Sequence, residues 1–170
     1  MLLVTHSPYP RYDRVLQLET TAETSANISF GDLAGDGKLD IVLAKGRHRP
    51  LVDRVLLGDG TGGIRSAYDL GTASDRSYSA TLADLDGDGR PDIIVANRGE
   101  PGKTSNYVCL NRGSGTFDAD CMPVAAHSAT TIATADIDND GKVDLIVPHR
   151  DGGQSCVYLN GTRPVCVAGR

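Results

Sequence analysis

A nine-residue pattern of aspartate and glycine occurs three times in this 170-residue chain, and its regular spacing limits the possible folds more than any other feature. The copies are DLAGDGKLD at 32–40, DLDGDGRPD at 84–92 and DIDNDGKVD at 136–144, so successive copies begin 52 residues apart. Each copy follows a short segment of small and apolar residues, precedes an apolar run, and is followed later by a Gly-rich turn. Self-similarity at a fixed period is typical of architectures that repeat one supersecondary unit.

The segments around each copy predict short β-strands. The apolar runs at 41–44, 93–96 and 145–147 are too short for helices and are flanked by Gly, Pro and Asp. Four short strands in each unit, joined by short connections, form an antiparallel meander, and serial meanders are typical of propeller blades. Because the apolar runs are uninterrupted, we expect these strands to be covered on both faces. The sequence therefore predicts an all-β fold of four-stranded antiparallel β-propeller blades.

The repeat also predicts how the chain is divided. Residues 2–18 align without gaps on 54–70, which indicates that the chain opens with the outer hairpin of a preceding blade. Closed propellers have about 4–8 blades, so about three full blades and a hairpin leave the ring open. We expect the remaining blades of a longer chain to complete it, and a second copy of this chain is the alternative. The predicted parts of a single propeller region, 1–170, are the outer strands of a preceding blade, 1–24, and the blade repeats 25–76, 77–128 and 129–170.

Alternating carboxylates in each copy indicate a cation site. Of the 22 acidic residues, 19 are Asp, and 11 of these lie in the three copies. A tightly coiled chain can aim positions 1, 3 and 5 at one ion, with the carbonyl of position 7 and the carboxylate of position 9 completing an all-oxygen set. Glycine at position 6 supplies the positive φ of a sharp turn. Such a set favours Ca²⁺ over Mg²⁺.

Two other interpretations of the pattern are weaker. An EF-hand loop needs a Glu at position 12, where this chain has apolar residues, Leu43, Val95 and Val147. A plain turn rich in Asp and Gly would explain one copy, but three copies in register favour an ion site.

These loops resemble the FG-GAP or VCBS repeat, which is found in the propeller of integrin α subunits and in many exported bacterial proteins. The resemblance covers nearly the whole chain. It implies a β-propeller in which the loop between the first and second strands of each blade binds Ca²⁺ in a structural role. The second and third loops match the pattern in full, with Arg90 and Lys142 acting through their carbonyls: Asp84, Asp86, Asp88, Arg90 and Asp92, then Asp136, Asp138, Asp140, Lys142 and Asp144.

The first loop departs from the pattern, because Ala34 replaces the carboxylate at position 3. Its remaining residues would hold a weaker site or none: Asp32, Asp36, Lys38 and Asp40. We therefore expect two strong calcium sites and one that is weak or empty.

The four cysteines indicate an oxidising compartment. Cys109 and Cys121 flank one Gly-rich turn, and Cys156 and Cys166 flank the equivalent turn one unit later. We expect two disulfides within blades, with free core thiols as the alternative. Disulfides persist outside the cytosol, so we expect an extracellular, cell-surface or periplasmic location. No apolar stretch is long enough to cross a membrane, so membrane insertion is not expected.

Loops on the side opposite the Asp loops gather basic residues. The loops between second and third strands and those between blades emerge there in a meander. The candidate ligand-face residues are Lys45, Arg47, His48, Arg49, Arg76, Arg98, Lys103, His149 and Arg150. They could steer an anionic glycan or an acidic protein surface, or form a solvated charged rim. Because aromatic residues for base stacking are sparse, nucleic acid is not expected as a partner.

No motif for catalysis stands out. The chain has no G-x-S-x-G elbow and no His pair at zinc spacing, and GDGTGG at 58–63 corresponds to plain hairpin turns in the other units. The sequence therefore predicts a non-catalytic, calcium-binding propeller segment that serves as a rigid extracellular interaction scaffold for a protein or glycan, as in cell adhesion. The alternative is a substrate-binding or accessory part of a larger secreted carbohydrate-active enzyme. The absence of Trp weakens a lectin function.

Overall fold

The computed structural model describes residues 12, 15–99 and 104–161, and over these residues it contains strands and no helix. No segment in the described ranges forms a helix that is long and apolar enough to cross a membrane. The predicted all-β fold is confirmed.

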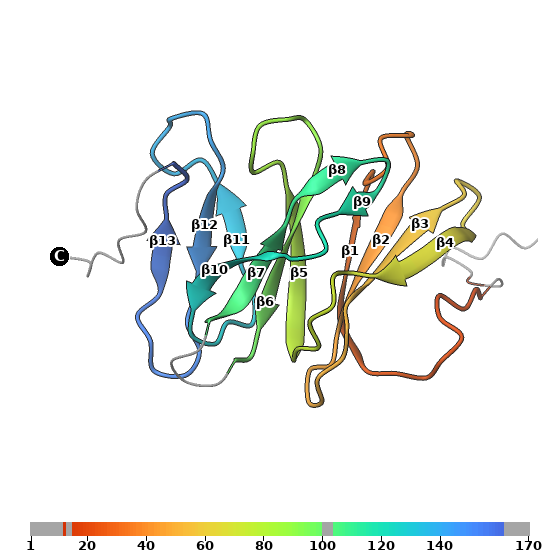
Figure 1. Ribbon diagram of the computed structural model, residues 1–170, viewed down its shortest axis with the longest axis horizontal. Coiled ribbons are helices and arrows are strands. Elements are labelled where there is room, and N and C mark those ends of the chain that lie inside the picture. The colour runs from red at the N-terminus through yellow and green to blue at the C-terminus, as the bar shows by residue number, and fades with distance from the viewer. Residues whose placement is uncertain (1–11, 13–14, 100–103, 162–170) are drawn as a thin grey trace, which may run out of the picture.

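The strands form antiparallel sheets that stand side by side (Figure 1). The first sheet contains, in chain order, β1 (Ser25–Gly31), β2 (Asp40–Lys45), β3 (Arg54–Gly58) and β4 (Ile64–Asp69). The second sheet contains β5 (Ser77–Ala83), β6 (Asp92–Asn97), β7 (Thr104–Cys109) and β10 (Met122–Ala126). The third sheet has three described strands, β11 (Ala133–Ala135), β12 (Asp144–Val147) and β13 (Cys156–Tyr158). The first two sheets are four-stranded, propeller-like blades, and no sheet closes on itself within the described residues.

The three Asp loops connect equivalent strands in the same register. The last residue of the first strand pairs with the aspartate at position 9, as Gly31–Asp40, Ala83–Asp92 and Ala135–Asp144. All three loops project at the upper end of the sheets in Figure 1. The repeat in the sequence therefore becomes a repeat in space, with the loops gathered at one end.

The strand β6 shows why the apolar runs are uninterrupted. All six of its residues are buried. Ile93 and Val95 belong to an apolar cluster shared with the first sheet, whereas Ile94 and Ala96 belong to a cluster shared with the third sheet. Because successive side chains of a strand point to opposite faces, a strand between two sheets needs apolar residues at every position.

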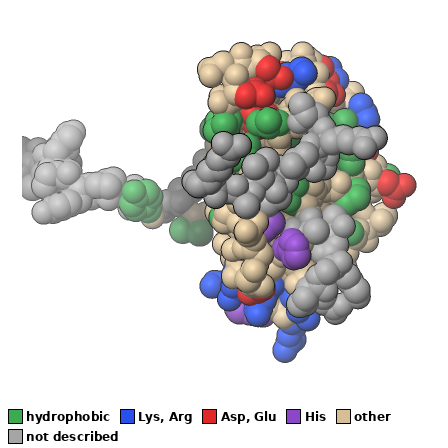
Figure 2. Space-filling view, turned by 90° about the vertical axis from the view of Figure 1, so that its left-hand side faces the viewer, with side chains coloured by type: hydrophobic (Ala, Val, Ile, Leu, Met, Phe, Trp, Pro, Cys, Tyr) green, Lys and Arg blue, Asp and Glu red, His purple; other side chains and the backbone are tan. Residues whose placement is uncertain are grey.

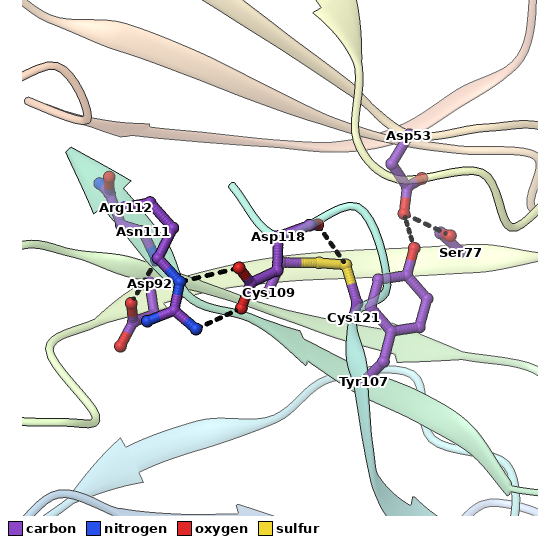
Figure 3. Close-up of a disulfide and its surroundings, with 9 residues drawn as sticks. All are labelled: Asp53, Ser77, Asp92, Tyr107, Cys109, Asn111, Arg112, Asp118 and Cys121. Atoms are coloured by element: carbon purple, nitrogen blue, oxygen red, sulfur yellow. Dashed lines mark hydrogen bonds and ion pairs between the residues drawn. A yellow bond between two sulfur atoms is a disulfide. The ribbon is translucent and has the colours of Figure 1, made fainter. Parts of the chain in front are cut away.

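The second sheet departs from a simple meander between its third and fourth strands. The Gly-rich turn forms a separate hairpin, β8 (Asn111–Gly113) with β9 (Thr116–Phe117), before the chain returns to the sheet as β10. Arg112 closes this hairpin with two hydrogen bonds to Asp118, at 2.7 and 2.6 Å (Figure 3). The disulfide between Cys109 and Cys121, with Cα atoms 4.5 Å apart, joins the end of β7 to the start of β10. This predicted bridge is confirmed.

Two predictions fall at the ends of the chain. Among the described residues of the segment 1–24 there is no strand, and its other residues lie outside the described ranges. Cys166 and the predicted fourth strand of the third repeat also fall outside them, so the second disulfide stays a prediction. Cys156 is buried at the start of β13. The boundaries of the repeats likewise stay predictions.

Candidate metal loops and the opposite face

The aspartate at position 1 closes each Asp loop. Its carboxylate accepts hydrogen bonds from the backbone N–H groups of positions 5 and 6, at 2.8 to 3.1 Å, and this holds for Asp32, Asp84 and Asp136. A short carboxylate reaches its own backbone in this way, whereas the longer Glu side chain is poorly suited to so tight a turn. The turn itself therefore selects Asp at position 1.

Two positions in each loop have positive φ. Position 6 is glycine, with φ of 77°, 83° and 85° at Gly37, Gly89 and Gly141. Position 4 also has positive φ, which the sequence analysis missed, at Gly35, Gly87 and Asn139. An added Cβ would meet nothing within 4 Å at any of these glycines, so backbone conformation and not crowding selects them. The signal was present in the sequence, since Gly and Asn are the residues that adopt this conformation most readily.

Three carboxylates converge in each of the second and third loops. One oxygen from each of Asp84, Asp86 and Asp88 lies within 4.8 Å of the others, and the same is true of Asp136, Asp138 and Asp144. Calcium binds oxygen at about 2.3–2.6 Å, so the oxygens around one ion lie within roughly twice that distance of one another. Both groups therefore fit Ca²⁺ in donor type and in spacing. Two other predicted ligands, Asp92 and Asp140, lie outside these groups of three.

The basic residue at position 7 pairs with the carboxylate at position 5 in every loop. The pairs are Lys38 with Asp36 at 3.3 Å, Arg90 with Asp88, and Lys142 with Asp140 at 3.5 Å. These side chains are at least partly exposed, so each pair adds little to stability by itself. They do place a positive charge beside the acidic turn.

In the first loop, the carboxylate at position 5 pairs with two basic side chains instead of one. The carboxylate of Asp36 pairs with Lys38 and also with Arg65, at 3.1 Å. Burial raises the pKa of Asp36, but the hydrogen bonds from Lys38 and the charges of Lys38 and Arg65 lower it overall. No group of three potential metal ligands forms among the described residues of this loop. Lys38 and Arg65 thus balance the charge of Asp36, and Ala34 supplies no carboxylate at position 3. Both features weaken the case for a metal ion in the first loop.

The aspartate at position 9 is buried in all three loops and accepts backbone hydrogen bonds from two elements. One carboxylate oxygen accepts from the N–H of position 2 of its own loop. The other accepts from an N–H at the end of the third strand or two residues beyond it, in Gly58, Asn111 and Asn160. The accepting residues are Asp40, Asp92 and Asp144. Position 9 therefore ties the loop to the third strand, a role that the sequence analysis did not predict.

The surroundings of this aspartate differ between the second and third loops. Burial raises the pKa of Asp92, with a further contribution from the charges of Asp86 and Asp88. Hydrogen bonds from Asn160 and Ile137 instead lower the pKa of Asp144. In the third loop the carboxylate at position 9 is also part of the group of three, which it is not in the second loop.

An asparagine links the first Asp loop, and another links the second, to the next sheet. The side-chain NH₂ of Asn111 donates to the carbonyl of Leu33 in the first loop at 2.9 Å, and that of Asn160 donates to Leu85 in the second loop at 2.8 Å. Both also donate to position 8 of their own loop. The equivalent residue of the first sheet is Gly58, which has no side chain to make this contact.

The opposite end of the molecule carries most of the predicted ligand-face residues, and Lys and Arg side chains gather at the lower end of the view in Figure 2. The exposed ones are Arg47, His48, Arg49, Arg76, Arg98 and Arg150. His149 is half-buried beside His127, with ring centroids 5.2 Å apart, and burial together with His127 lowers its pKa. Lys103 lies outside the described residues.

The prediction for Lys45 is wrong. This residue ends β2 and is fully buried, with its ammonium group paired to Glu19 and, at 2.6 Å, to Glu23. Burial alone would lower the pKa of Lys45, but the hydrogen bonds and charges of the two glutamates raise it. Both partners come from the segment before β1. One period later Lys45 corresponds to Asn97 and Glu19 to Gly71, so the repeat did not predict this pairing. Lys45 is unavailable to a ligand.

A buried carboxylate, Asp53, connects the first and second sheets near this end. It accepts hydrogen bonds from the N–H of Lys45 at 2.7 Å, from the hydroxyl of Ser77 at 2.9 Å and from the hydroxyl of Tyr107 at 2.6 Å (Figure 3). Burial raises its pKa. Nothing in the sequence singles out Asp53, because a lone Asp before a strand carries no distinctive pattern.

Propeller-like sheets that repeat in register, each with an Asp loop between its first and second strands, define the class of this protein as an all-β repeat protein. The model of the FG-GAP-like repeat family matches residues 32–95 and 84–147, which together span more than half of the chain. Each match runs from one Asp loop through the strand after the next loop, and the two matches are offset by the same 52 residues as the loops. The chain belongs to the FG-GAP-like repeat family. A comparison with curated proteins found no match.

Proposed function

We propose that this chain is a non-catalytic, calcium-stabilised propeller segment that presents its basic face to a partner outside the cytosol. The observation that carries the proposal is the convergence of three carboxylates in each of the second and third loops, at a spacing that fits Ca²⁺. The disulfide between Cys109 and Cys121 supports an oxidising location.

Calcium would act on the fold through residues that already organise the loops. A bound ion supplies positive charge that offsets the repulsion between Asp84, Asp86 and Asp88. Asp84 at position 1 accepts a backbone hydrogen bond that closes the turn, and Asp92 at position 9 accepts one from Asn111, next to the third strand. Because ordering the carboxylates also orders these backbone contacts, ion binding becomes part of the folding free energy.

A rigid scaffold follows from the same contacts. The Asn111 and Asn160 amides join the first and second loops to the next sheet, so the three sheets do not depend on apolar packing alone. A fixed set of sheets holds the exposed loops at the basic end in constant positions. Such surfaces suit recognition of a partner, because little conformational entropy is lost on binding.

The test is a count of bound calcium by titration calorimetry, paired with thermal melts in calcium and in chelator. The native chain should bind about two ions, and each occupied site should stabilise it by about 2.7 kcal/mol at a free concentration about 100 times Kd. Asp86→Ala and Asp138→Ala each remove the position 3 carboxylate that the first loop naturally lacks. Each should lose one ion and its share of the stabilisation.

Ala34→Asp is the converse change, since it restores the position 3 carboxylate in the first loop. It should add a calcium site, or raise calcium affinity there, without altering the other two loops. A native chain that binds no calcium, or melts that are the same in calcium and in chelator, would overturn the proposal.

A further inference from the structure

Three arginines from three different sheets meet at one tyrosine at the basic end of the molecule. Arg47, Arg98 and Arg150 each follow the second strand of their sheet, β2, β6 and β12. Tyr78 lies on β5, the first strand of the middle sheet. The repeat therefore delivers one guanidinium group from each unit to the same place.

The contacts with Tyr78 are direct. The Cζ atom of Arg47 lies 5.8 Å from the ring centroid, and that of Arg150 lies 5.6 Å from it, which is within cation–π range. Arg150 also donates from Nη1 to the tyrosine hydroxyl at 3.1 Å. Burial raises the pKa of Tyr78, but hydrogen bonding and the charges of Arg150 and Arg98 lower it overall.

Backbone contacts fix where the arginines stand. The N–H of Arg98 donates to the carbonyl of Arg76 at 3.0 Å, and the N–H of Arg150 donates to Ser128 at 2.9 Å. The loop that carries Arg47 is held by a bridge between Gly46 and Ser77, directly before Tyr78. The three side chains therefore start from anchored positions on a rigid frame.

Among the described residues, the positive charge of this cluster is only partly balanced. Asp151 approaches Arg150, at 3.8 Å, which is a long contact for an ion pair. In the described part of the chain, no carboxylate lies within ion-pair distance of Arg47 or Arg98. All three arginines are exposed, so an external anion can reach them.

We propose that Arg47, Arg98 and Arg150 around Tyr78 form a binding site for the carboxylate side chain of an acidic loop on a partner protein. This inference rests on the proposed scaffold function, whose partner it identifies by chemistry. Guanidinium groups bind carboxylates through paired, charge-assisted hydrogen bonds. Binding at this site would add an anion to a cluster that the described residues leave positively charged.

The arrangement favours a peptide carboxylate over a sugar. A sugar ring needs an open aromatic face on which to stack. The ring of Tyr78 already contacts two guanidinium groups, and the chain has no Trp to serve instead. Three cations that converge on one point also suit a single compact anion better than a long polyanion, which would need an extended basic strip.

The experiment measures binding of a fluorescein-labelled hexaaspartate peptide by fluorescence anisotropy, in constant excess calcium. Arg98→Gln and Arg150→Gln should each weaken binding about tenfold, as expected for loss of one charge-assisted contact. Tyr78→Phe should weaken it about threefold, because the ring remains while the hydroxyl that orients Arg150 is lost. Arg49→Gln and Arg76→Gln are matched controls that remove the same charge from the same end outside the cluster. Each control should change affinity less than about twofold, the effect of net charge alone.

Several results would overturn this site. Equal losses in the cluster variants and in the controls would show a diffuse electrostatic effect. Tighter binding of a labelled heparin hexasaccharide through the same arginines would assign the site to glycans instead. If no peptide binds while the melts still respond to calcium, this site fails and the proposed function stands. If the peptide binds as expected while calcium has no effect on melting, the proposed function fails in its calcium part.

Discussion

At the scale of single residues, Asp53 and Asn106 show how one position can carry a charge in one sheet and none in the next. Each accepts a hydrogen bond from the N–H of the residue that ends the second strand, Lys45 for Asp53 and Asn97 for Asn106. Both side chains are buried. The second oxygen of Asp53 faces the hydroxyls of Ser77 and Tyr107, whereas the NH₂ of Asn106 donates to two carbonyls. The neighbours thus decide which of the two residue types is accommodated.

Asp53→Asn should leave stability at neutral pH nearly unchanged, within about 1 kcal/mol, because hydroxyl groups can reverse and donate or accept as needed. Asp53→Ala should cost about 1–3 kcal/mol, because it leaves an N–H and two hydroxyls buried without an acceptor. Urea unfolding of both variants measures the difference. An alanine variant as stable as the asparagine variant would contradict the importance of these hydrogen bonds.

The same pair of variants predicts a pH effect. Because burial raises the pKa of Asp53 in the folded protein, the folded state holds this proton at pH values where the unfolded state has released it. The contribution of Asp53 to stability is therefore largest below the ordinary Asp pKa and decreases as pH rises toward the folded value. The difference in unfolding free energy between the native chain and Asp53→Asn should fall over this window. A difference that stays constant from acid to neutral pH would contradict the raised pKa.

At the scale of strands and loops, the asparagines after β7 and β13 join neighbouring sheets in a way that apolar packing does not. Asn111 is fully buried and donates to Leu33, whose own side chain is buried in the cluster between the first two sheets. Asn160 makes the equivalent contact from a half-buried position. One amide therefore connects two Asp loops in sequence at each junction between sheets.

Asn111→Ala should destabilise the protein by about 1–3 kcal/mol, because two carbonyls lose their donor at a buried site. Asn160→Ala is the matched control, and it should cost less because water can reach the partly exposed site. Denaturant midpoints measure both. Equal effects of the two substitutions, or no effect of either, would show that the junctions depend on apolar contacts alone.

The disulfide between Cys109 and Cys121 ties β7 to β10 across the inserted hairpin. A bridge that closes a loop of this size restricts the unfolded chain and stabilises the folded state by about 3 kcal/mol in the chain-entropy description. The double substitution Cys109→Ser with Cys121→Ser should lower the unfolding free energy by about that amount. The denaturation midpoint of this variant should be lower than that of the native chain in the absence of reductant. An unchanged midpoint would contradict a stabilising role of the disulfide.

The sequence predicts what repeats and misses what occurs once. Strands, Asp loops and the first disulfide follow from local patterns that recur with the same period, so they could be predicted. The ion pairs of Lys45 with Glu19 and Glu23 could not, because the equivalent of Lys45 in the next unit is Asn97 and the equivalent of Glu19 is Gly71, so the pairing does not recur. The contact between Asn111 and Leu33 joins residues 78 positions apart, and nothing in either local pattern specifies it. Likewise, Asn160 begins an N-G-T sequence, which is the acceptor pattern for N-glycosylation. In the structure its side-chain amide instead donates a hydrogen bond to Leu85 of the second Asp loop.

At the scale of the whole molecule, the three sheets are not equally supported. The second sheet has apolar clusters on both faces, one shared with the first sheet and one with the third. Its strand β6 is buried throughout, whereas β11 in the third sheet has no buried residue. Stability within a protein varies with such cover, and amide hydrogen exchange reports it. The amides of β6 should therefore exchange most slowly.

Removal of calcium should destabilise the three sheets to different extents. In the first loop Asp36 pairs with Lys38 and with Arg65 of β4, whereas the second and third loops gather three carboxylates each. Chelation should therefore speed amide exchange in β6 and β12 more than in β2, as measured by hydrogen exchange with mass spectrometry in calcium and in chelator. Ala34→Asp is the matched control, because a carboxylate at position 3 should make amide exchange in β2 depend on calcium as well. If β2 of the native chain loses protection as much as β6 does, the sheets unfold as one unit and calcium does not act loop by loop.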